Sequence, residues 1–192
     1  KSNESLPKLI QKYLKLKPNI IHSIKNSFYK LVSNKEKILG VHFRGSDYRK
    51  ELNGHPLFID ELQFFDVIDS FLSQYNIKSI FLATDDQLSA ERFVKKYGAK
   101  VLLYEDIFRS HTTANPFFTI SNRKYHEYLN GFEVLKDAIS LSLCSYLICS
   151  ESNVSNFVKN YKKSNNETFE KIHTFKSDKS NKKNYLHMEK DF

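Results

Sequence analysis

Apolar strands that each run into polar residues constrain this fold more than any other feature of the sequence. Continuous apolar runs of strand length occur at Ile38–Phe43, Ile77–Ala83, Lys100–Tyr104 and Ser145–Cys149. Between them lie segments whose apolar residues recur at helical spacing. Because continuous apolar strands are typical of sheets buried on both faces, the alternation predicts an α/β fold. We expect a Rossmann-like parallel sheet with helices on both faces.

The spacing of apolar residues also predicts how the chain is organised. Ile21, Ile24, Phe28 and Leu31 form one helical stripe, and a long loop is expected from about residue 105 to 128. Predicted helices span about 18–31, 62–75, 87–97 and 132–143, with a last helix ending near 161. We expect an N-terminal helical segment (1–37), a core (38–162) that completes a single domain, and a polar basic tail (163–192) in which 169–175 is the candidate for regular structure.

Composition narrows the classes of partner. Of 192 residues, 30 are Lys or Arg and 22 are Asp or Glu, so the formal charge of +8 favours anionic partners such as phosphates, nucleotides, nucleic acid or an acidic membrane surface. The basic residues are spread widely and lack a groove-binding pattern, so no nucleic acid partner is expected. Cys144 and Cys149 match neither a zinc site nor a disulfide framework and are expected in the core. The expected location is cytoplasmic or peripheral to a membrane.

The stretch GVHFRGSDYR follows the first predicted strand and holds the main candidates for chemistry. Ligands of parallel sheets bind beyond the carboxyl ends of the strands. Arg44 offers a planar fork of donors for phosphate, and His42, two residues earlier, points to the same side of an extended chain. Gly45 allows close approach of the backbone to a ligand, and Asp47 can orient a cation or act as a base. The alternative is an ordinary ion pair between Arg44 and Asp47.

Two further strand exits are polar. Asp85 and Asp86 follow the second strand, where they indicate a cation site or a helix cap, with capping favoured and no metal expected. Ser152, Asn153 and Ser155 surround the start of the last helix, and the free N–H groups of a helix start are suited to phosphate. The alternative is that one of these residues caps the helix and binds nothing.

Glu133 and Asp137 lie four residues apart on a predicted helix, so two like charges are neighbours at a small energetic cost. If Asp137 faces the cleft, it can accept hydrogen bonds from N1–H and the exocyclic amine of guanine. The alternative is that both carboxylates face water. His55, His111 and His126 lie in predicted loops and are expected at the surface. The phosphate-binding motifs GxxxxGK[ST] and GxGxxG are absent from the sequence.

With these residues assembled, the chain resembles the GDP-fucose-dependent fucosyltransferase superfamily, which holds α1,2-, α1,6- and protein O-fucosyltransferases and nodulation fucosyltransferases. The resemblance covers about residues 38–157 and rests on the blocks GVHFRGSDYR, IFLATDD and GFEVLKDAISLSLCSYLICSESNVS. It implies the donor-binding, carboxyl-terminal half of a GT-B enzyme. Family members that carry a second cation in the first motif differ from this chain, in which Arg49 or Arg109 is the candidate for that contact.

The resemblance implies roles for individual residues. His42 and Arg44 would contact the donor, with Arg44 on the β-phosphate of GDP, and Asp137 would read guanine. Asp47 is the candidate for the base that activates the acceptor. The remaining implied donor-pocket residues are Gly45, Asp85, Asp86, Ser152, Asn153 and Ser155.

The expected function is transfer of a sugar, most simply fucose, from a GDP-sugar to an acceptor hydroxyl with inversion. No metal or cofactor is expected, and GDP-fucose is the donor substrate. The expected partners are that donor, a glycan or protein acceptor and, through basic residues, a membrane surface. The alternatives are a basic domain that binds nucleic acid or another polyanion, and a degenerate, non-catalytic glycosyltransferase domain.

Overall fold

A five-stranded parallel sheet with helices on both faces forms the centre of the molecule. The computed structural model describes residues 4–32, 37–46, 58–112, 116 and 122–176. The strands are β1 (Ile38–Phe43), β2 (Ser79–Thr84), β3 (Val101–Leu102), β4 (Tyr146–Ser150) and β5 (Lys171–Phe175), and every pair is parallel. The predicted α/β fold is confirmed.

The order of the strands determines where a ligand can bind. The sheet runs β3-β2-β1-β4-β5, so the chain builds outward from β1 in one direction and then crosses to β4 on the other side. In register, His42 of β1 lies between Ala83 of β2 and Cys149 of β4. Sheets of this kind bind ligands beyond the carboxyl ends of the strands, where the winding reverses. The residues that follow β1 therefore lie at the favoured place.

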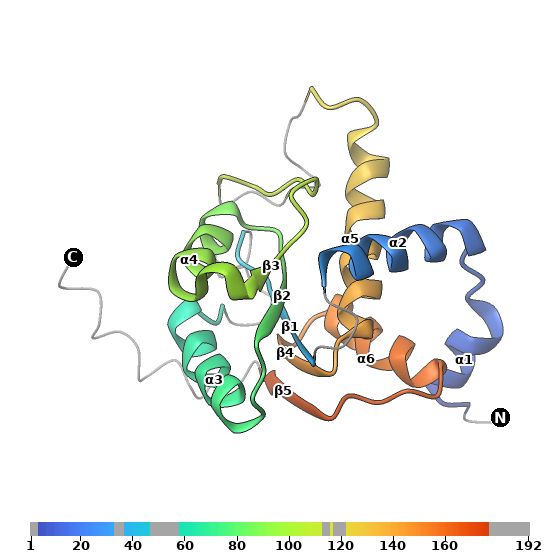
Figure 1. Ribbon diagram of the computed structural model, residues 1–192. Helices are drawn as coiled ribbons and strands as arrows, with labels where there is room; N and C mark the ends of the chain where they lie inside the picture. The colour runs from blue at the N-terminus through green and yellow to red at the C-terminus, as the bar shows by residue number, and fades with distance from the viewer. Residues whose placement is uncertain (1–3, 33–36, 47–57, 113–115, 117–121, 177–192) are drawn as a thin grey trace.

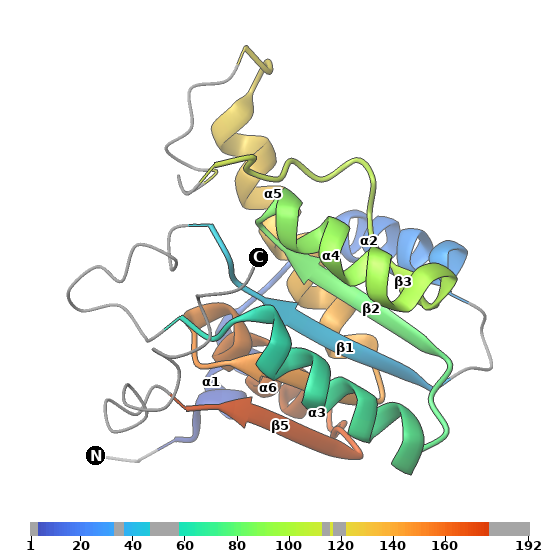
Figure 2. The same cartoon turned by 90° about the vertical axis from the view of Figure 1, so that its left-hand side faces the viewer.

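Helices cover the two faces of the sheet unequally (Figures 1 and 2). Two helices, α3 and α4, pack on one face, whereas α2, α5 and α6 pack on the other and α1 lies against α6. No helix in the described ranges combines the length and apolarity that a membrane crossing requires. The bounds are α1 (Leu6–Tyr13), α2 (Pro18–Leu31), α3 (Glu61–Gln74), α4 (Gln87–Tyr97), the 3-10 turn η2 (Gly98–Lys100), α5 (His126–Leu143) and α6 (Asn153–Ser164).

Alternate residues of β1 build the two halves of the core. Leu39, Val41 and Phe43 face α3 and α4, where the Phe43 ring lies edge-on to Phe64 with 5.0 Å between centroids. Ile38 faces α2 and α5 on the other side of the sheet. Residues two apart in a strand point to the same face, so His42 belongs to the α5 side.

Close packing of α5 on β1 depends on Gly40. A Cβ at this position would lie 3.2 Å from Cys144 and from Leu141, tighter than an ordinary contact. Both expected core cysteines are buried, and no disulfide joins them. The close approach brings the inner side of α5 next to the end of β1.

Three boundaries differ from those predicted. α5 begins at His126 rather than near 132, and its first turns project past the sheet (Figures 1 and 2). β3 has two residues, because its start is taken up by the 3-10 turn Gly98–Lys100 and its pairing with β2 is limited to Val101 and Leu102. The third difference is in the tail, where β5 begins at Lys171 within the stretch 169–175 that was the candidate for regular structure, and its pairing with β4 makes it a strand of the sheet.

Candidate functional site

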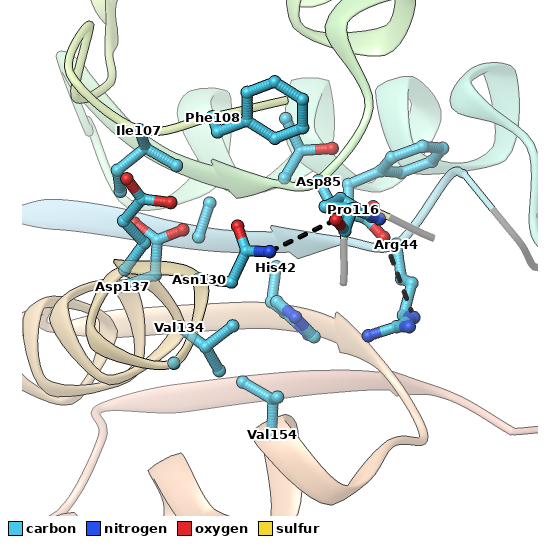
Figure 3. A pocket seen from close by; sticks show the side chains of 15 residues that line it. His42, Arg44, Asp85, Ile107, Phe108, Pro116, Asn130, Val134, Asp137 and Val154 are labelled. Atoms are coloured by element: carbon cyan, nitrogen blue, oxygen red, sulfur yellow. Dashed lines mark hydrogen bonds and ion pairs between the residues drawn. The ribbon is translucent and has the colours of Figure 1, made fainter. Parts of the chain in front are cut away.

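A cavity of about 280 Å³ opens beside the carboxyl ends of β1 and β2 and is walled by α5 (Figure 3). Arg44 and Asp137 lie at opposite sides of it in Figure 3, with His42 between them. Its other polar lining comes from Thr84, Asp85, Asn130 and Glu133, and its apolar lining includes Ile107, Phe108, Val134 and Val154. Four residues predicted separately, His42, Arg44, Asp85 and Asp137, therefore meet in one cavity.

Asp85 links the ends of two neighbouring strands. Its Oδ1 accepts a hydrogen bond from the Gly45 backbone N–H at 3.0 Å, and its Oδ2 accepts one from the Ser46 hydroxyl. Nε of Arg44 lies 3.8 Å from the same Oδ2. The carboxylate thus holds the backbone after β1 in place and positions Arg44. The ion-pair partner expected for Arg44, Asp47, lies outside the described residues, as do Arg49 and His55.

Gly45 is required by the approach of another side chain. A Cβ at Gly45 would lie 2.4 Å from Oδ2 of Asp86 and 2.7 Å from its Cβ. Asp86 caps α4 by accepting a hydrogen bond from the Leu88 N–H, which confirms capping for one of the two aspartates. Asp86 does not line the cavity.

His42 is a buried, neutral imidazole. Burial, together with the nearby Arg44 charge, lowers the pKa of His42 to about 4. Its Nδ1 is buried without a hydrogen-bond partner in the described parts of the chain. At neutral pH the ring therefore presents an uncharged surface to the cavity, and the positive charge at this end belongs to Arg44.

Asp137 is the carboxylate of the cavity wall that is available to a ligand. It makes no hydrogen bond to any described residue. Burial raises the pKa of Asp137 to about 7, an effect to which Glu133 and Asp106 add and which Arg109 and Lys136 oppose. A carboxylate with this pKa changes charge near neutrality, which makes it a candidate binding group with a physical cause for its perturbation.

Glu133 also lines the cavity, whereas the helical pattern did not decide between the cavity and water. Its two oxygens accept hydrogen bonds from the guanidinium of Arg123 at 2.6 and 3.2 Å. Arg123 donates a further bond to Asn130 at 2.9 Å and lies over the Phe108 ring, 5.2 Å from its centroid. Sequence reasoning missed the role of Arg123 because its contact with Glu133 forms only in the folded chain, and its second partner, Asn130, lay outside the predicted helix.

Two other residues are placed differently from their expectation. Arg109, a candidate for a second donor contact, is buried and bonds to the carbonyl of Tyr104 at 2.9 Å, away from the cavity wall. His126 was expected at the surface but is buried, because α5 begins at this residue. Its Nε2 lies 3.0 Å from the carbonyl oxygen of Pro116.

Two of the three residues predicted at the start of α6, Ser152 and Ser155, are engaged in capping. Ser152 Oγ accepts a hydrogen bond from the Ser155 N–H at 3.0 Å, and Ser155 Oγ accepts one from the Ser152 N–H at 3.0 Å, which is a capping box. Val154, rather than Ser152, Asn153 or Ser155, lines the cavity. Across the described ranges, no group of three or more His, Cys, Asp or Glu side chains is arranged to hold a metal.

The fold and the cavity define the class: a Rossmann-like α/β protein with a cavity at the carboxyl edge of its parallel sheet, the place where sheets of this kind bind ligands. No family model and no curated protein matches the sequence. Among solved structures, POFUT1 in complex with GDP matches with a TM-score of 0.56 at 14% identity, over 86% of this chain and 50% of that one. POFUT1 with GDP-fucose matches with a TM-score of 0.55 at 14% identity, over 86% of this chain and 48% of that one.

A third solved structure, NodZ alpha-1,6-fucosyltransferase soaked with GDP-fucose, matches with a TM-score of 0.47 at 17% identity, over 77% of this chain and 43% of that one. At these identities the POFUT1 likeness shows a shared fold. The chain spans about half the length of the POFUT1 structures that it matches.

Proposed function

We propose that this chain binds a GDP-sugar and forms the donor-binding half of a GT-B fucosyltransferase. The arrangement of the cavity carries the proposal: a cationic group, Arg44, faces an open carboxylate, Asp137, across a cavity at the carboxyl edge of the sheet. A nucleoside diphosphate has the matching polarity, with an anionic end and a base that donates hydrogen bonds. Solved POFUT1 structures with this fold contain GDP or GDP-fucose.

Guanine is the base that suits Asp137. An ionised carboxylate has two acceptor oxygens and no donor. Guanine offers two adjacent donors, N1–H and the exocyclic amine, whereas the corresponding edge of adenine has an acceptor at N1. The apolar side chains of Ile107, Phe108 and Val134 provide surface against which a flat base can pack.

Arg44 would bind the diphosphate and stabilise the leaving group. Cleavage of the bond between the sugar and GDP develops negative charge on the β-phosphate, so a preorganised guanidinium favours the transition state more than the ground state. Asp85 and Gly45 contribute by holding the Arg44 segment in place. In the proposed reaction the sugar is transferred with inversion and without a metal. Asp47 is the proposed base that takes the proton from the acceptor hydroxyl.

The described residues offer a cavity for the donor but no comparable candidate site for the acceptor. The matched POFUT1 chains are about twice as long as the portion that this chain covers. We therefore propose donor binding as the activity of this chain by itself, and transfer to a glycan or protein hydroxyl as the activity of the complete enzyme.

Binding of GDP tests the proposal. We expect GDP to raise the melting temperature and Arg44→Ala to lower GDP affinity by about 10- to 100-fold, the size expected for loss of a charge-assisted hydrogen bond. Arg44→Lys keeps the charge but loses the planar fork, so it should give an intermediate affinity. Lys96→Ala, which removes a cation paired with Asp69 on the outside of the molecule, is the matched control.

Calorimetric titration with GDP, UDP and ADP completes this experiment. Preference for GDP, with Lys96→Ala unchanged, supports the proposal. Failure of the unmodified chain to bind GDP at millimolar concentration contradicts it, as does equal binding by the Arg44→Ala variant.

A further inference from the structure

Arg123 is bonded to a residue of the cavity wall, Glu133, in a contact that donor binding alone does not explain. Three carboxylates line the cavity: Asp85, Glu133 and Asp137. Asp85 is held by the segment after β1, and Glu133 is held by Arg123. Asp137 has no hydrogen bond to a described residue. The protein therefore engages two of these carboxylates and leaves the third for a ligand.

We infer that Arg123 is a specificity-determining positioning residue, which neutralises Glu133 so that Asp137 alone reads the base of the bound nucleotide. The inference rests on the proposed function and extends it to a residue outside the motifs of the donor site. Arg123 acts through Glu133 and does not line the cavity itself.

The contact between Arg123 and Glu133 has the geometry of a fixed pair. Both carboxylate oxygens are engaged by the two terminal nitrogens of the guanidinium, at 2.6 and 3.2 Å, and the Glu133 side chain is 10% exposed. The bond to Asn130 and the Phe108 ring restrict Arg123 further. An ion pair whose guanidinium is held by three neighbours stabilises the protein more than a surface ion pair, because less side-chain freedom is lost when the pair forms.

The position of Glu133 makes its neutralisation matter for Asp137. The two residues are four apart on α5, so their side chains are neighbours on one side of the helix. Two unpaired carboxylates at this spacing disfavour ionisation of each other, and only the ionised form of Asp137 accepts two hydrogen bonds from guanine. Losing Arg123 would therefore weaken recognition of guanine without removing any atom that contacts it.

Other titratable groups lie on the elements around Asp137. Lys136 of α5 donates to both oxygens of Asp106, and Arg109 approaches from the loop after β3. His42 and Arg44 of the β1 end and Asp85 of the β2 end line the same cavity, and the hydroxyl of Tyr104 bonds to Ser140 at 2.8 Å. The hydrogen bonds among these groups involve neither Glu133 nor Arg123 and should persist when that pair is substituted, whereas Arg109 also interacts electrostatically with Glu133.

Affinity for GDP measured as a function of pH tests the inference. Because burial raises the pKa of Asp137 to about 7, GDP affinity should be high above this pH and fall below it as Asp137 binds a proton. Arg123→Gln leaves Glu133 charged and unpaired. We expect it to move the midpoint of the pH profile upward by about one unit, which corresponds to roughly fivefold weaker GDP binding at pH 7.

Two further variants distinguish electrostatics from disruption of the fold. Arg123→Gln combined with Glu133→Gln removes the unpaired charge and should return the midpoint towards that of the unmodified chain. Glu133→Gln alone leaves the Arg123 charge near Asp137 and should move the midpoint downward. The preference for GDP over ADP at neutral pH should fall in Arg123→Gln and recover in the double variant.

The possible results separate this inference from the proposed function. An unmodified chain that fails to bind GDP at any pH contradicts the proposed function. An unmodified chain that binds GDP, together with an unshifted midpoint in both Arg123→Gln and Glu133→Gln, contradicts the role of Arg123 and leaves donor binding intact. Should Arg123→Gln fail to fold, the downward shift expected of Glu133→Gln decides the question.

Discussion

At the scale of single residues, Gly45 shows how the cavity depends on a close approach between segments. The sequence suggested that this glycine lets the backbone come near a ligand. In the structure, the atom that approaches it most closely belongs to Asp86, the cap of α4. The glycine therefore allows the end of β1 and the start of α4 to meet, and Asp85 then bonds to the Gly45 N–H.

Gly45→Ala should destabilise the protein. Its new Cβ would lie 2.4 Å from Asp86 Oδ2 and 2.7 Å from Asp86 Cβ, so the N-cap has to move. We expect the free energy of unfolding to fall by about 1–3 kcal/mol, as for other overpacked sites. Urea denaturation measures the change.

Gly131→Ala provides the matched control for that measurement. A Cβ at Gly131 meets nothing within 4 Å, and the residue lies within α5, where alanine is preferred by up to about 1 kcal/mol. The two substitutions add the same methyl group and should change stability in opposite directions. A Gly45→Ala protein as stable as the unmodified chain would show that α4 does not depend on this contact.

His42 illustrates what a residue type alone leaves undecided. Histidine near a phosphate site is compatible with a cation, but burial and the adjacent Arg44 lower its pKa to about 4. The two neighbours in the motif therefore have different charges at neutral pH. A sequence pattern cannot supply this result because it depends on how much solvent the fold removes.

At the scale of elements, two roles were predicted for the start of α6, helix capping and phosphate binding, and they can be tested separately. Ser152 and Ser155 form the capping box, and the first amides of any helix lack an intrahelical acceptor. Capping and phosphate binding are compatible. The capping box uses the N–H of Ser155, and a phosphate would bind the earlier N–H groups of the helix, those of Asn153 and Val154.

Substitution of Ser152 distinguishes the two roles. Ser152→Ala removes the cap and should lower the free energy of unfolding by about 1 kcal/mol. Ser152→Asp keeps a capping oxygen but places a negative charge at the helix start. If the diphosphate lies there, we expect Ser152→Asp to retain stability and to bind GDP more weakly than the unmodified chain, as measured by calorimetry. Equal GDP affinity in Ser152→Asp would limit these residues to capping.

The length of α5 decides more of the site than any other element. Periodicity predicted the helix from about 132, which would leave Asn130, one of the partners of Arg123, in a loop. Because the helix begins at His126, Asn130, Glu133 and Asp137 lie on one rigid element along the cavity. The start of this helix was hard to predict from the sequence because no side chain caps its first turn.

At the scale of the whole molecule, the charge of +8 supports a test of the polyanion alternative. Binding of an oligonucleotide through dispersed basic residues releases counterions and falls steeply as salt concentration rises. Binding of GDP in a partly enclosed cavity is screened much less. We expect the shift in melting temperature with GDP to persist at salt concentrations that abolish any binding of a single-stranded oligonucleotide.

Competition between the two ligands makes that comparison sharper. Arg44→Ala should impair GDP binding and leave the weak oligonucleotide signal nearly unchanged, because it removes one of 30 basic residues. Oligonucleotide binding that survives high salt and displaces GDP would favour the polyanion function over donor binding.

The sequence by itself determined the parallel α/β class and the polar strand exits that contain His42, Arg44 and Asp85, because these follow from local periodicity and from the order of segments. Asp137 was identified as a candidate, with its orientation left open. Tertiary structure decided which groups meet: the Gly45 N–H bonds to Asp85 across 40 positions of sequence, and Arg123 bonds to Glu133 and to Asn130, which lies in α5 because the helix begins at His126. Pairing, burial and pKa depend on distances in the folded chain, and local sequence does not specify those distances.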